Sequence, residues 1–384
     1  MGAAEARVRV VALLRRGLPL RVAHLTGEAG FSGGEVQLFH LVEGLRKRNH
    51  HSVVLCPEGS RSEAEARRRG IDTRPVRVRN EWSPRCLASV RRELARSAPD
   101  IVHLHTGHAT WLGGLAARGL GLPAVTTRRM DRPVKRNLRT RILYGLCVQR
   151  AVAISPAVAR QLAEGGVPER MIQIVPSAVD PDALTPQHGR SATRRALGTS
   201  DTQLCLLTAA TLVPRKGVDL LLQALAELDR RGLDAELWIA GEGPERRRLV
   251  RLAKRLGIGA RARFLGVRSD VPDLLAACDV FALASRQEGL GVAVLEALAL
   301  GRPVVATRAG GLCDALRHEE TALLVPPDDP LALADALERL LRDRREAELM
   351  ARRGPAAVAQ GFSLDPMVEA YERIYRDVLA EAGR

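Results

Sequence analysis

Residues 280–301 read VFALASRQEGLGVAVLEALALG, and this stretch decides the fold. Its first five residues form a short apolar run, a glycine-containing loop follows, and a second apolar run begins near Leu290. The first run has the length of a buried strand, and the second has the length of a helix. A strand that passes through a short loop into a helix is the repeating part of a βαβ unit. The stretch therefore predicts a parallel sheet covered by helices.

The same alternation of short apolar runs and amphipathic helical segments extends over the whole chain. Two such blocks in series predict an α/β protein of two doubly wound, Rossmann-like domains. Ligands of doubly wound sheets bind beyond the carboxyl ends of the strands, so the cleft between two such domains is the expected site. The apolar runs that predict strands cover residues 21–25, 52–56, 100–104, 124–127, 151–154, 172–175, 203–209, 235–240, 263–265, 280–284, 303–306 and 322–325.

The domain boundary is expected over residues 176–199, where proline, glycine, serine and threonine cluster and the periodicity fades. We expect an N-terminal extension at residues 1–19, a first domain at 20–188 and a second domain at 189–360. A last helical segment, 361–384, follows the completed second block, and we expect it to pack back on the first domain.

The net charge of +15 lies wholly in the first half of the chain. Residues 1–190 carry 31 Lys and Arg against 16 Asp and Glu, whereas residues 191–384 carry 28 of each kind. A one-sided basic domain indicates an anionic partner: a membrane surface, a phosphate-bearing or acidic acceptor, or nucleic acid. Aromatic residues make up only 3% of the chain, which leaves few stacking platforms for nucleic acid, so nucleic acid is the least favoured of the three.

Hydropathy and cysteine spacing bear on the cellular location. No stretch approaches the roughly 18 consecutive apolar residues of a membrane span. The six cysteines stand far apart, with no C-x-x-C pair, which argues against a zinc ribbon and against a disulfide framework. The sequence therefore predicts a cytoplasmic protein that reaches the inner face of the membrane only as a peripheral protein.

Two glutamates in the opening stretch suggest a ligand. Glu296 is the only charged residue of segment 289–301, and it either caps a neighbouring turn or accepts hydrogen bonds from a ligand diol. Glu288 lies eight residues earlier, about 12 Å away at the rise of a helix, which is the reach from one sugar to another across a diphosphate. The backbone N–H groups of residues 289–291, at the expected helix start, form an anion site between the two carboxylates. The segment therefore predicts a binding site for a nucleotide sugar.

The ordered set of motifs resembles the retaining glycosyltransferases of family 4, and the resemblance covers nearly the whole chain. Its most specific part is Glu288-x7-Glu296, while the glycine motifs are weak when taken singly. The other motifs that carry the resemblance are Gly33-Gly34-Glu35, His103-Leu-His105, Pro214-Arg-Lys-Gly217, Gly241-Glu-Gly-Pro244, Phe264-Leu-Gly266, Gly301-Arg-Pro-Val-Val-Ala, Gly310-Gly311 and Leu324-Val-Pro-Pro327.

The resemblance implies the GT-B fold, in which two domains face each other across a cleft, the first binding the acceptor and the second the nucleotide-sugar donor. Glu296 would bind the donor ribose, and Glu288 would bind the hydroxyls of the donor sugar. Lys216 would neutralise the charge that develops on the diphosphate as its bond to the sugar breaks. His105 would touch the sugar near its reacting carbon. By resemblance, then, the catalytic residues are Glu288, Lys216 and His105.

Further residues are implied to bind the substrates. At the position of Thr211 the family often has an arginine, a cation at the diphosphate. Arg215 stands nearby in the sequence and could take over this role. Arg128 and Arg129, at the end of a strand in the basic domain, either clamp a phosphate of the donor or acceptor or form a solvated loop. No residue cluster suggests an ion, so we expect neither a metal nor a cofactor. The donor-binding residues implied by the resemblance are Gly33, Gly34, Arg215, Phe264, Gly266, Gly289, Leu290, Gly291 and Glu296.

These expectations combine into a retaining, metal-independent hexosyltransferase. It would move a sugar from a nucleotide-sugar donor to a glycan or lipid-linked acceptor, as in the assembly of cell-envelope polysaccharide or lipopolysaccharide. A nucleotide-sugar epimerase or a phosphorylase on the same scaffold stays open. A dinucleotide-dependent oxidoreductase is disfavoured because the loop at residues 27–34 lacks the G-x-G-x-x-G order. A non-enzymatic basic binding module is supported only by the charge of the first half.

Overall fold

The fold is seen in a computed structural model that describes residues 18–28, 30, 32–78 and 83–383. Up to residue 17, the expected N-terminal extension lies outside the described residues. Within the described part of the chain, no helix combines the length and the apolar character needed to cross a membrane.

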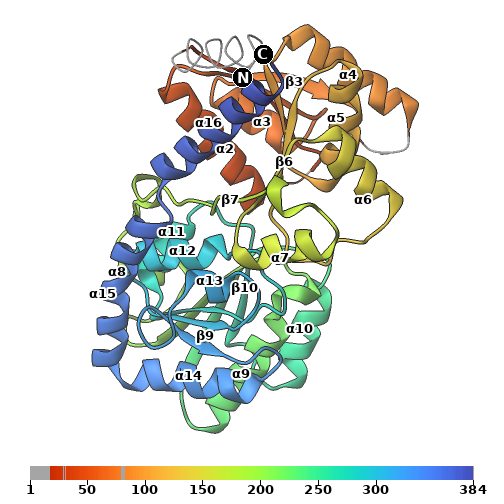
Figure 1. Ribbon diagram of the computed structural model, residues 1–384. Coiled ribbons are helices and arrows are strands. Elements are labelled where there is room, and N and C mark those ends of the chain that lie inside the picture. Colours follow the sequence, from red (N-terminus) through yellow and green to blue (C-terminus); the bar gives the residue numbers. More distant parts are fainter. Residues whose placement is uncertain (1–17, 29, 31, 79–82, 384) are drawn as a thin grey trace. The chain divides into compact units, whose positions relative to one another are not determined.

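The chain forms two compact units (Figure 1). The first unit contains the described residues up to Ala178 and those from Leu364 onward, and the second unit is Val179–Ser363. The boundary thus lies within the expected region 176–199, ten residues before the expected end of the first domain at 188. The segment after Ala178 is held in the second unit because the backbone N–H and the ring of His188 both bond to the Asp273 carboxylate, at 2.7 and 3.3 Å.

A seven-stranded parallel sheet forms the centre of the first unit, in the order β3-β2-β1-β4-β5-β6-β7. Six of its strands follow the expected apolar runs, and the edge strand β3 is an addition. Each parallel pair is joined through a helical or loop crossover, as the alternation predicts. The strands are β1 (Arg21–Leu25), β2 (His51–Pro57), β3 (Asp72–Val76), β4 (Ile101–Leu104), β5 (Ala124–Arg128), β6 (Arg150–Ala153) and β7 (Ile172–Ile174).

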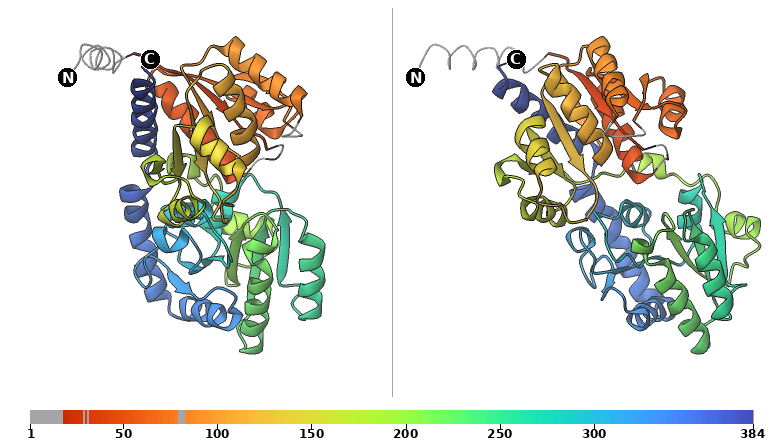
Figure 2. Two further views of the ribbon diagram at one scale, coloured as in Figure 1. Left: turned by 45° about the vertical axis from the view of Figure 1, so that its right-hand side comes forward. Right: turned by 90° about the vertical axis from the view of Figure 1, so that its right-hand side faces the viewer.

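The helices of the first unit cover this sheet and include the last helix of the chain, α16. In Figure 2, α16 is the dark blue helix that lies along the first unit, and it packs on α2. The helices are α2 (Gly33–Lys47), α3 (Arg61–Arg68), α4 (Pro84–Ser97), α5 (Gly107–Gly119), α6 (Leu138–Ile142), the π-helix η1 (Leu143–Cys147), α7 (Pro156–Glu164), the 3-10 turn η2 (Glu169–Met171) and α16 (Leu364–Glu381).

Helix α16 completes the apolar core of the first unit. Its buried side chains, from Met367 to Leu379, form one cluster with residues of β1, α2, β4, β5 and β6. Tyr375 is fully buried at the centre of this face. The first unit is therefore built from two segments that the whole second unit separates in sequence.

The second unit has a six-stranded parallel sheet in the order β10-β9-β8-β11-β12-β13. Counted from its first strand this is the order 3-2-1-4-5-6 of the Rossmann fold. All six strands follow the expected apolar runs. The strands are β8 (Leu204–Ala209), β9 (Ala235–Ala240), β10 (Ala262–Gly266), β11 (Val280–Leu283), β12 (Val304–Thr307) and β13 (Leu323–Val325).

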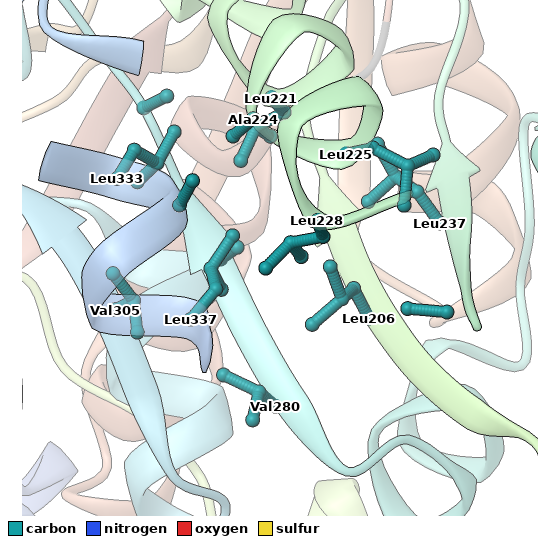
Figure 3. Close-up of a cluster of buried hydrophobic side chains, with 14 of the residues drawn as sticks. Leu206, Leu221, Ala224, Leu225, Leu228, Leu237, Val280, Val305, Leu333 and Leu337 are labelled. Atoms are coloured by element: carbon teal, nitrogen blue, oxygen red, sulfur yellow. The ribbon is translucent and has the colours of Figure 1, made fainter. Parts of the chain in front are cut away.

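Apolar residues of α9 and α14 fill one face of the second sheet. Figure 3 shows leucines of both helices pointing toward Leu206, Val280 and Val305 of the central strands. The helical segments of this unit are η3 (Asp182–Leu184), α8 (Arg190–Ala196), η4 (Pro214–Lys216), α9 (Val218–Arg230), α10 (Arg246–Arg255), α11 (Val271–Ala277), α12 (Val292–Ala299), α13 (Leu312–Ala315), α14 (Pro330–Arg342) and α15 (Arg344–Gly361).

Candidate active site

The loops that carry the expected donor-binding residues leave the carboxyl ends of strands in the second unit. The turn η4 follows β8, residues 284–291 follow β11, and β10 ends at Gly266. Because all six strands are parallel, these ends share one edge of the sheet. The structure brings Lys216 and Glu288 into contact at this edge.

The Glu288 carboxylate is held through one of its two oxygens. Oε2 accepts a hydrogen bond from Nζ of Lys216 and another from Oγ of Ser285, the latter at 3.0 Å. Oε1 accepts no hydrogen bond from any residue that the structure describes. Lys216 has three N–H groups and uses one of them here. The pair therefore offers one carboxylate oxygen and ammonium protons to a ligand that carries both hydroxyls and phosphates.

Gly217 fixes the position of Lys216. Its φ is +60°, and a Cβ at this position would lie 1.9 Å from the carbonyl oxygen of Ala284. No side chain fits there, so the turn η4 can approach the end of β11 only through a glycine. This close approach brings the lysine to the glutamate.

Arg286 ties the two loops together. Its Nη1 and Nη2 donate to the two oxygens of Asp219 at 2.8 and 3.0 Å, and Nη1 also donates to the Pro214 carbonyl at 2.8 Å. Its backbone N–H donates to the carbonyl of Arg215 at 2.7 Å. A two-pronged arginine–carboxylate pair restricts orientation as well as distance. The arginine thus holds η4 against the loop that carries Glu288.

Glu296 lies on α12 without a partner. Its carboxylate makes no hydrogen bond or ion pair with any described residue, and burial raises its pKa from 4.5 to about 7. The side chain keeps partial access to solvent. The cap of a neighbouring turn, one of the two interpretations of this residue, is therefore not what the structure shows. An unpaired carboxylate with partial access is suited to accept hydrogen bonds from a diol.

The start of α12 has the features of an anion site. Gly291 has φ +84° and precedes Val292, where the helix begins. The N–H groups of Gly289, Leu290 and Gly291 meet no acceptor among the described residues. The loop is anchored behind, because Gly311 donates its N–H to the carbonyl of Glu288 at 2.9 Å. These donors and the helix dipole favour a bound phosphate.

The remaining donor-binding candidates of the second unit lie at the same edge. The guanidinium of Arg215 forms no ion pair with the described residues. Phe264 is half-buried against the core of the unit, on the edge strand β10. Gly266 ends this strand with φ +70°, and its carbonyl accepts the N–H of Gly241 at 2.7 Å. That Phe264 and Gly266 bind the donor stays a prediction.

In the first unit, Gly33 and Gly34 open α2 beside Arg129. The helix start is fixed by a capping box: the side chain of Ser32 accepts the backbone N–H of Glu35, and the carboxylate of Glu35 accepts the backbone N–H of Ser32 at 2.9 Å. A Cβ on Gly34 would lie 3.6 Å from Cδ of Arg129, and nothing lies within 4 Å of one on Gly33. The helix N-terminus and the guanidinium therefore present positive charge side by side.

Arg129 is a cation without a counter-ion. Its Nη1 donates to Nδ1 of His105 at 3.3 Å, while its Nε is buried with no hydrogen-bond partner. Burial lowers the pKa of the guanidinium. No carboxylate of the described residues forms an ion pair with it, since Glu35 is engaged by Ser32. Such a group is costly unless an anion joins it.

The imidazole of His105 is enclosed. Because Arg129 can only donate, Nδ1 of His105 accepts and its proton lies on Nε2, which donates to Nδ1 of His24 at 3.1 Å. His24 in turn contacts Oγ of Ser52 at 3.3 Å through Nε2. Burial lowers the pKa of His24 to about 3, and that of His105 also falls well below its ordinary value. Both rings are neutral, and contact of His105 with the donor sugar stays a prediction.

His103 links this cluster to the C-terminal helix. Its Nδ1 bonds to the hydroxyl of Tyr375 at 2.6 Å, and its Nε2 bonds to Oγ1 of Thr127 at 2.7 Å. The same Oγ1 of Thr127 also bonds to the hydroxyl of Tyr371 at 2.9 Å. The rings of His103 and His105 lie 3.9 Å apart between centroids. Sequence reasoning missed both tyrosines.

The three histidines also raise the question of a metal. Nitrogens of His24, His103 and His105 lie within 4.8 Å of one another, as a metal site requires. Both nitrogens of His103, however, already bond to hydroxyls. The charge of Arg129 also opposes a cation at His105. The cluster is better explained as a hydrogen-bonded support for the site.

Arg128, like Arg129, has a buried Nε without a hydrogen-bond partner, but its guanidinium is engaged by a backbone carbonyl. Its Nη2 donates to the carbonyl of Arg132 at 2.5 Å, and burial lowers its pKa. This guanidinium holds its own loop, which favours the structural interpretation. Binding of a phosphate by Arg128 stays a prediction.

Comparisons with known proteins follow the two units. Residues 31–183 match the model of Glycosyltransferase Family 4, and residues 189–357 match that of glycosyl transferases group 1. The chain is a glycosyltransferase. It is 31% identical over 305 residues to N-acetyl-alpha-D-glucosaminyl L-malate synthase of Bacillus anthracis, covering 77% of this chain and 79% of the relative.

Two further proteins resemble the glycosyltransferase over nearly its full length. The lipopolysaccharide core biosynthesis glycosyltransferase LpsE of Rhizobium meliloti is 28% identical over 92% of this chain and 98% of its own. The crystal structure of Anabaena HepE with UDP-glucose superposes with a TM-score of 0.83 at 22% identity, over 92% and 99% of the two chains. The fold of the glycosyltransferase is that of the GT-B enzymes.

Proposed function

We propose that the enzyme transfers a hexose from a nucleoside-diphosphate sugar to an anionic glycan or lipid-linked acceptor, with retention at the anomeric carbon and without a metal ion. One observation carries the proposal. Among the described residues, Glu288 has one carboxylate oxygen without a partner, Glu296 on α12 has no partner, and the N–H groups of residues 289–291 between them meet no acceptor. Two sugars joined by a diphosphate match this order of groups.

In this proposal each group of the second unit has one task. Oε1 of Glu288 accepts a hydroxyl of the donor sugar, and Glu296 accepts the ribose diol. The N–H groups at the start of α12 bind the diphosphate. Lys216 keeps its bond to Glu288 and turns its other protons toward the phosphate, so it orients the sugar and the leaving group together.

The chemistry then needs charge stabilisation more than a protein nucleophile. As the bond between the anomeric carbon and the phosphate oxygen breaks, negative charge grows on the diphosphate. Lys216, the guanidinium of Arg215 and the helix N-terminus are positive groups that stabilise this charge. The departing oxygen takes the proton of the acceptor hydroxyl, which attacks the same face. In this proposal these positive groups do the work that a bound metal ion would otherwise do.

The acceptor is assigned to the first unit because of Arg129. A guanidinium that lacks a counter-ion, beside the start of α2, is suited to a carboxylate or phosphate on the acceptor. The names of two relatives agree with this assignment, since one is an N-acetyl-alpha-D-glucosaminyl L-malate synthase, with L-malate itself an anion, and the other is a lipopolysaccharide core biosynthesis glycosyltransferase. Cell-envelope glycan assembly, at the cytoplasmic face of the membrane, is the setting that we propose.

A thermal-shift panel of UDP-, GDP- and ADP-sugars tests donor binding, because a ligand that binds the folded state raises the unfolding temperature. We expect one nucleotide class to stabilise the wild type and the Lys254→Met variant equally, since Lys254 is an exposed lysine of the same unit. Lys216→Met should lose transfer by about 100-fold or more. Equal transfer by the two variants would refute the role of Lys216.

Product analysis then separates transfer from the alternative chemistry. Incubating the enzyme with a labelled nucleotide sugar and no acceptor should leave the sugar unchanged apart from slow hydrolysis. A new nucleotide sugar in that incubation would mean an epimerase. Nuclear magnetic resonance of the product linkage decides between retention and inversion.

A further inference from the structure

The segment between β5 and β6 gathers exposed apolar side chains. Of the eight large apolar residues that are exposed in the described part of the chain, three fall within residues 130–146. They are Met130, Leu138 and Leu146, exposed by 43%, 70% and 51%. Single exposed leucines need no explanation, but a group of three on one short segment marks a contact surface.

Helix geometry places two of these residues on one side. Residues of α6 and η1 form a continuous helical run, whose inner side buries Thr140, Leu143 and Cys147. Leu138 and Leu146 are exposed on the outer side, at a spacing of about two turns. In Figure 1, α6 lies on the outside of the first unit. The run thus buries one apolar side against the first unit and leaves two further leucines exposed on its outer side.

Four cations lie between or beside these apolar residues in the sequence. Arg132, Lys135, Arg136 and Arg141 are exposed, and none of them forms an ion pair with a described residue. No acidic residue is exposed between residues 130 and 146. We name the four cations together with Met130, Leu138 and Leu146 the basic–apolar face.

We propose that the basic–apolar face docks on an anionic lipid bilayer. Cations attract the phosphate headgroups, and leucines enter the boundary between headgroups and acyl chains. A nucleic acid would use the cations but has no place for the leucines, so the mixture favours a membrane. The inference rests on the proposed function only in that a lipid-linked acceptor explains why the enzyme would dock.

Helix α10 provides a matched control within the chain. Its exposed Arg247, Arg251, Lys254 and Arg255 are also without ion pairs in the described part of the structure. No exposed large apolar residue lies on this helix. Neutralising four cations here changes the net charge as much as neutralising the four of the basic–apolar face.

The experiment is co-sedimentation of the full chain with vesicles of phosphatidylcholine alone or with equal parts of phosphatidylglycerol. We expect binding only to the anionic vesicles. Changing all four cations of the face to Gln should weaken binding about 100-fold or more. Leu138→Ser with Leu146→Ser should weaken it about tenfold. The four Gln changes in α10 should alter it by about twofold at most.

The outcomes separate this inference from the proposed function. Nucleotide-sugar thermal shifts of all variants should match the wild type, because the face lies outside the donor-binding loops. Equal weakening by both sets of Gln changes would reduce the effect to net charge and overturn the proposal. Binding to a DNA duplex that depends on the cations but not on the leucines would replace the membrane by nucleic acid. Vesicle binding in a chain that binds no nucleotide sugar would instead refute the proposed function.

Discussion

The protonation of Glu296 should control donor affinity near neutral pH. Burial raises its pKa to about 7, and only the ionised form can accept both hydrogen bonds of a ribose diol. At pH 8 about nine-tenths of this carboxyl is ionised, and at pH 6 about one-tenth. We therefore expect the dissociation constant of the nucleotide sugar to be about tenfold higher at pH 6 than at pH 8.

Glu296→Gln should remove this dependence. The amide does not titrate, so its donor affinity should be flat between pH 6 and 8 and about 10- to 100-fold weaker than that of the wild type at pH 8. Isothermal titration calorimetry with an intact nucleotide sugar measures both. A free nucleoside diphosphate would confuse the result, because its terminal phosphate titrates near about pH 6. His24 and His105 do not interfere, since burial keeps their pKa values well below this range.

The same substitution should stabilise the unliganded enzyme. The pKa of Glu296 is higher in the folded state than the ordinary 4.5, so its ionisation lowers the free energy of unfolding. This loss is absent below about pH 4.5 and is largest above about pH 7. The increase in the free energy of unfolding that Glu296→Gln brings should therefore grow between pH 4.5 and pH 7, to at most about 3 kcal/mol at pH 8. Calorimetric unfolding at pH 5 and pH 8 checks it. A wild type with pH-independent donor affinity, or a variant that keeps the wild-type slope, would refute the reasoning.

Three further substitutions test the support of the site. Gly217→Ala should destabilise the second unit by about 3 kcal/mol or more, whereas Gly232→Ala, equally left-handed but in open space, should cost about 1 kcal/mol; calorimetry compares them. Tyr375→Phe should lower the free energy of unfolding by about 1–3 kcal/mol in a urea titration, because a nitrogen of buried His103 loses its partner; no change would contradict the bond. Arg129→Met should raise KM for an anionic acceptor about tenfold and leave KM for the donor unchanged in steady-state assays; a raised donor KM would move Arg129 to the diphosphate.

Strands with a continuous apolar run were predictable, and those without one were not. Strand β3 has the sequence DTRPV and lies at the edge of the sheet, where polar residues and a proline are tolerated. It therefore contains no apolar run from which it could have been predicted. The glycines of helix α5 weaken a helical pattern in the sequence. Its Gly113 is required by packing, since a Cβ there would lie 2.4 Å from Leu104. Edge pairing and close packing are tertiary contacts that local patterns do not contain.

The two candidate carboxylates, Glu288 and Glu296, could be found from the sequence because they lie in one continuous motif. The contact of Glu288 with Lys216 follows from the parallel strands, whose carboxyl ends bring both loops to the same side of the sheet. The support of the first-unit histidines was not predictable, because His103 and Tyr375 are 272 residues apart in sequence. The sequence also does not predict that both ring nitrogens of His105 form hydrogen bonds within the protein.

The division of the first unit into two distant segments has a consequence for synthesis. A ribosome completes the whole of Val179–Ser363 before it makes α16, whose side chains close the core of the first unit. Domains usually fold in the order in which they are made. Here the unit begun first must be finished last, and the newly made chain holds an uncovered apolar sheet until its final helix emerges. A chaperone that binds nascent chains would therefore have to cover the apolar surface of that sheet until α16 is made.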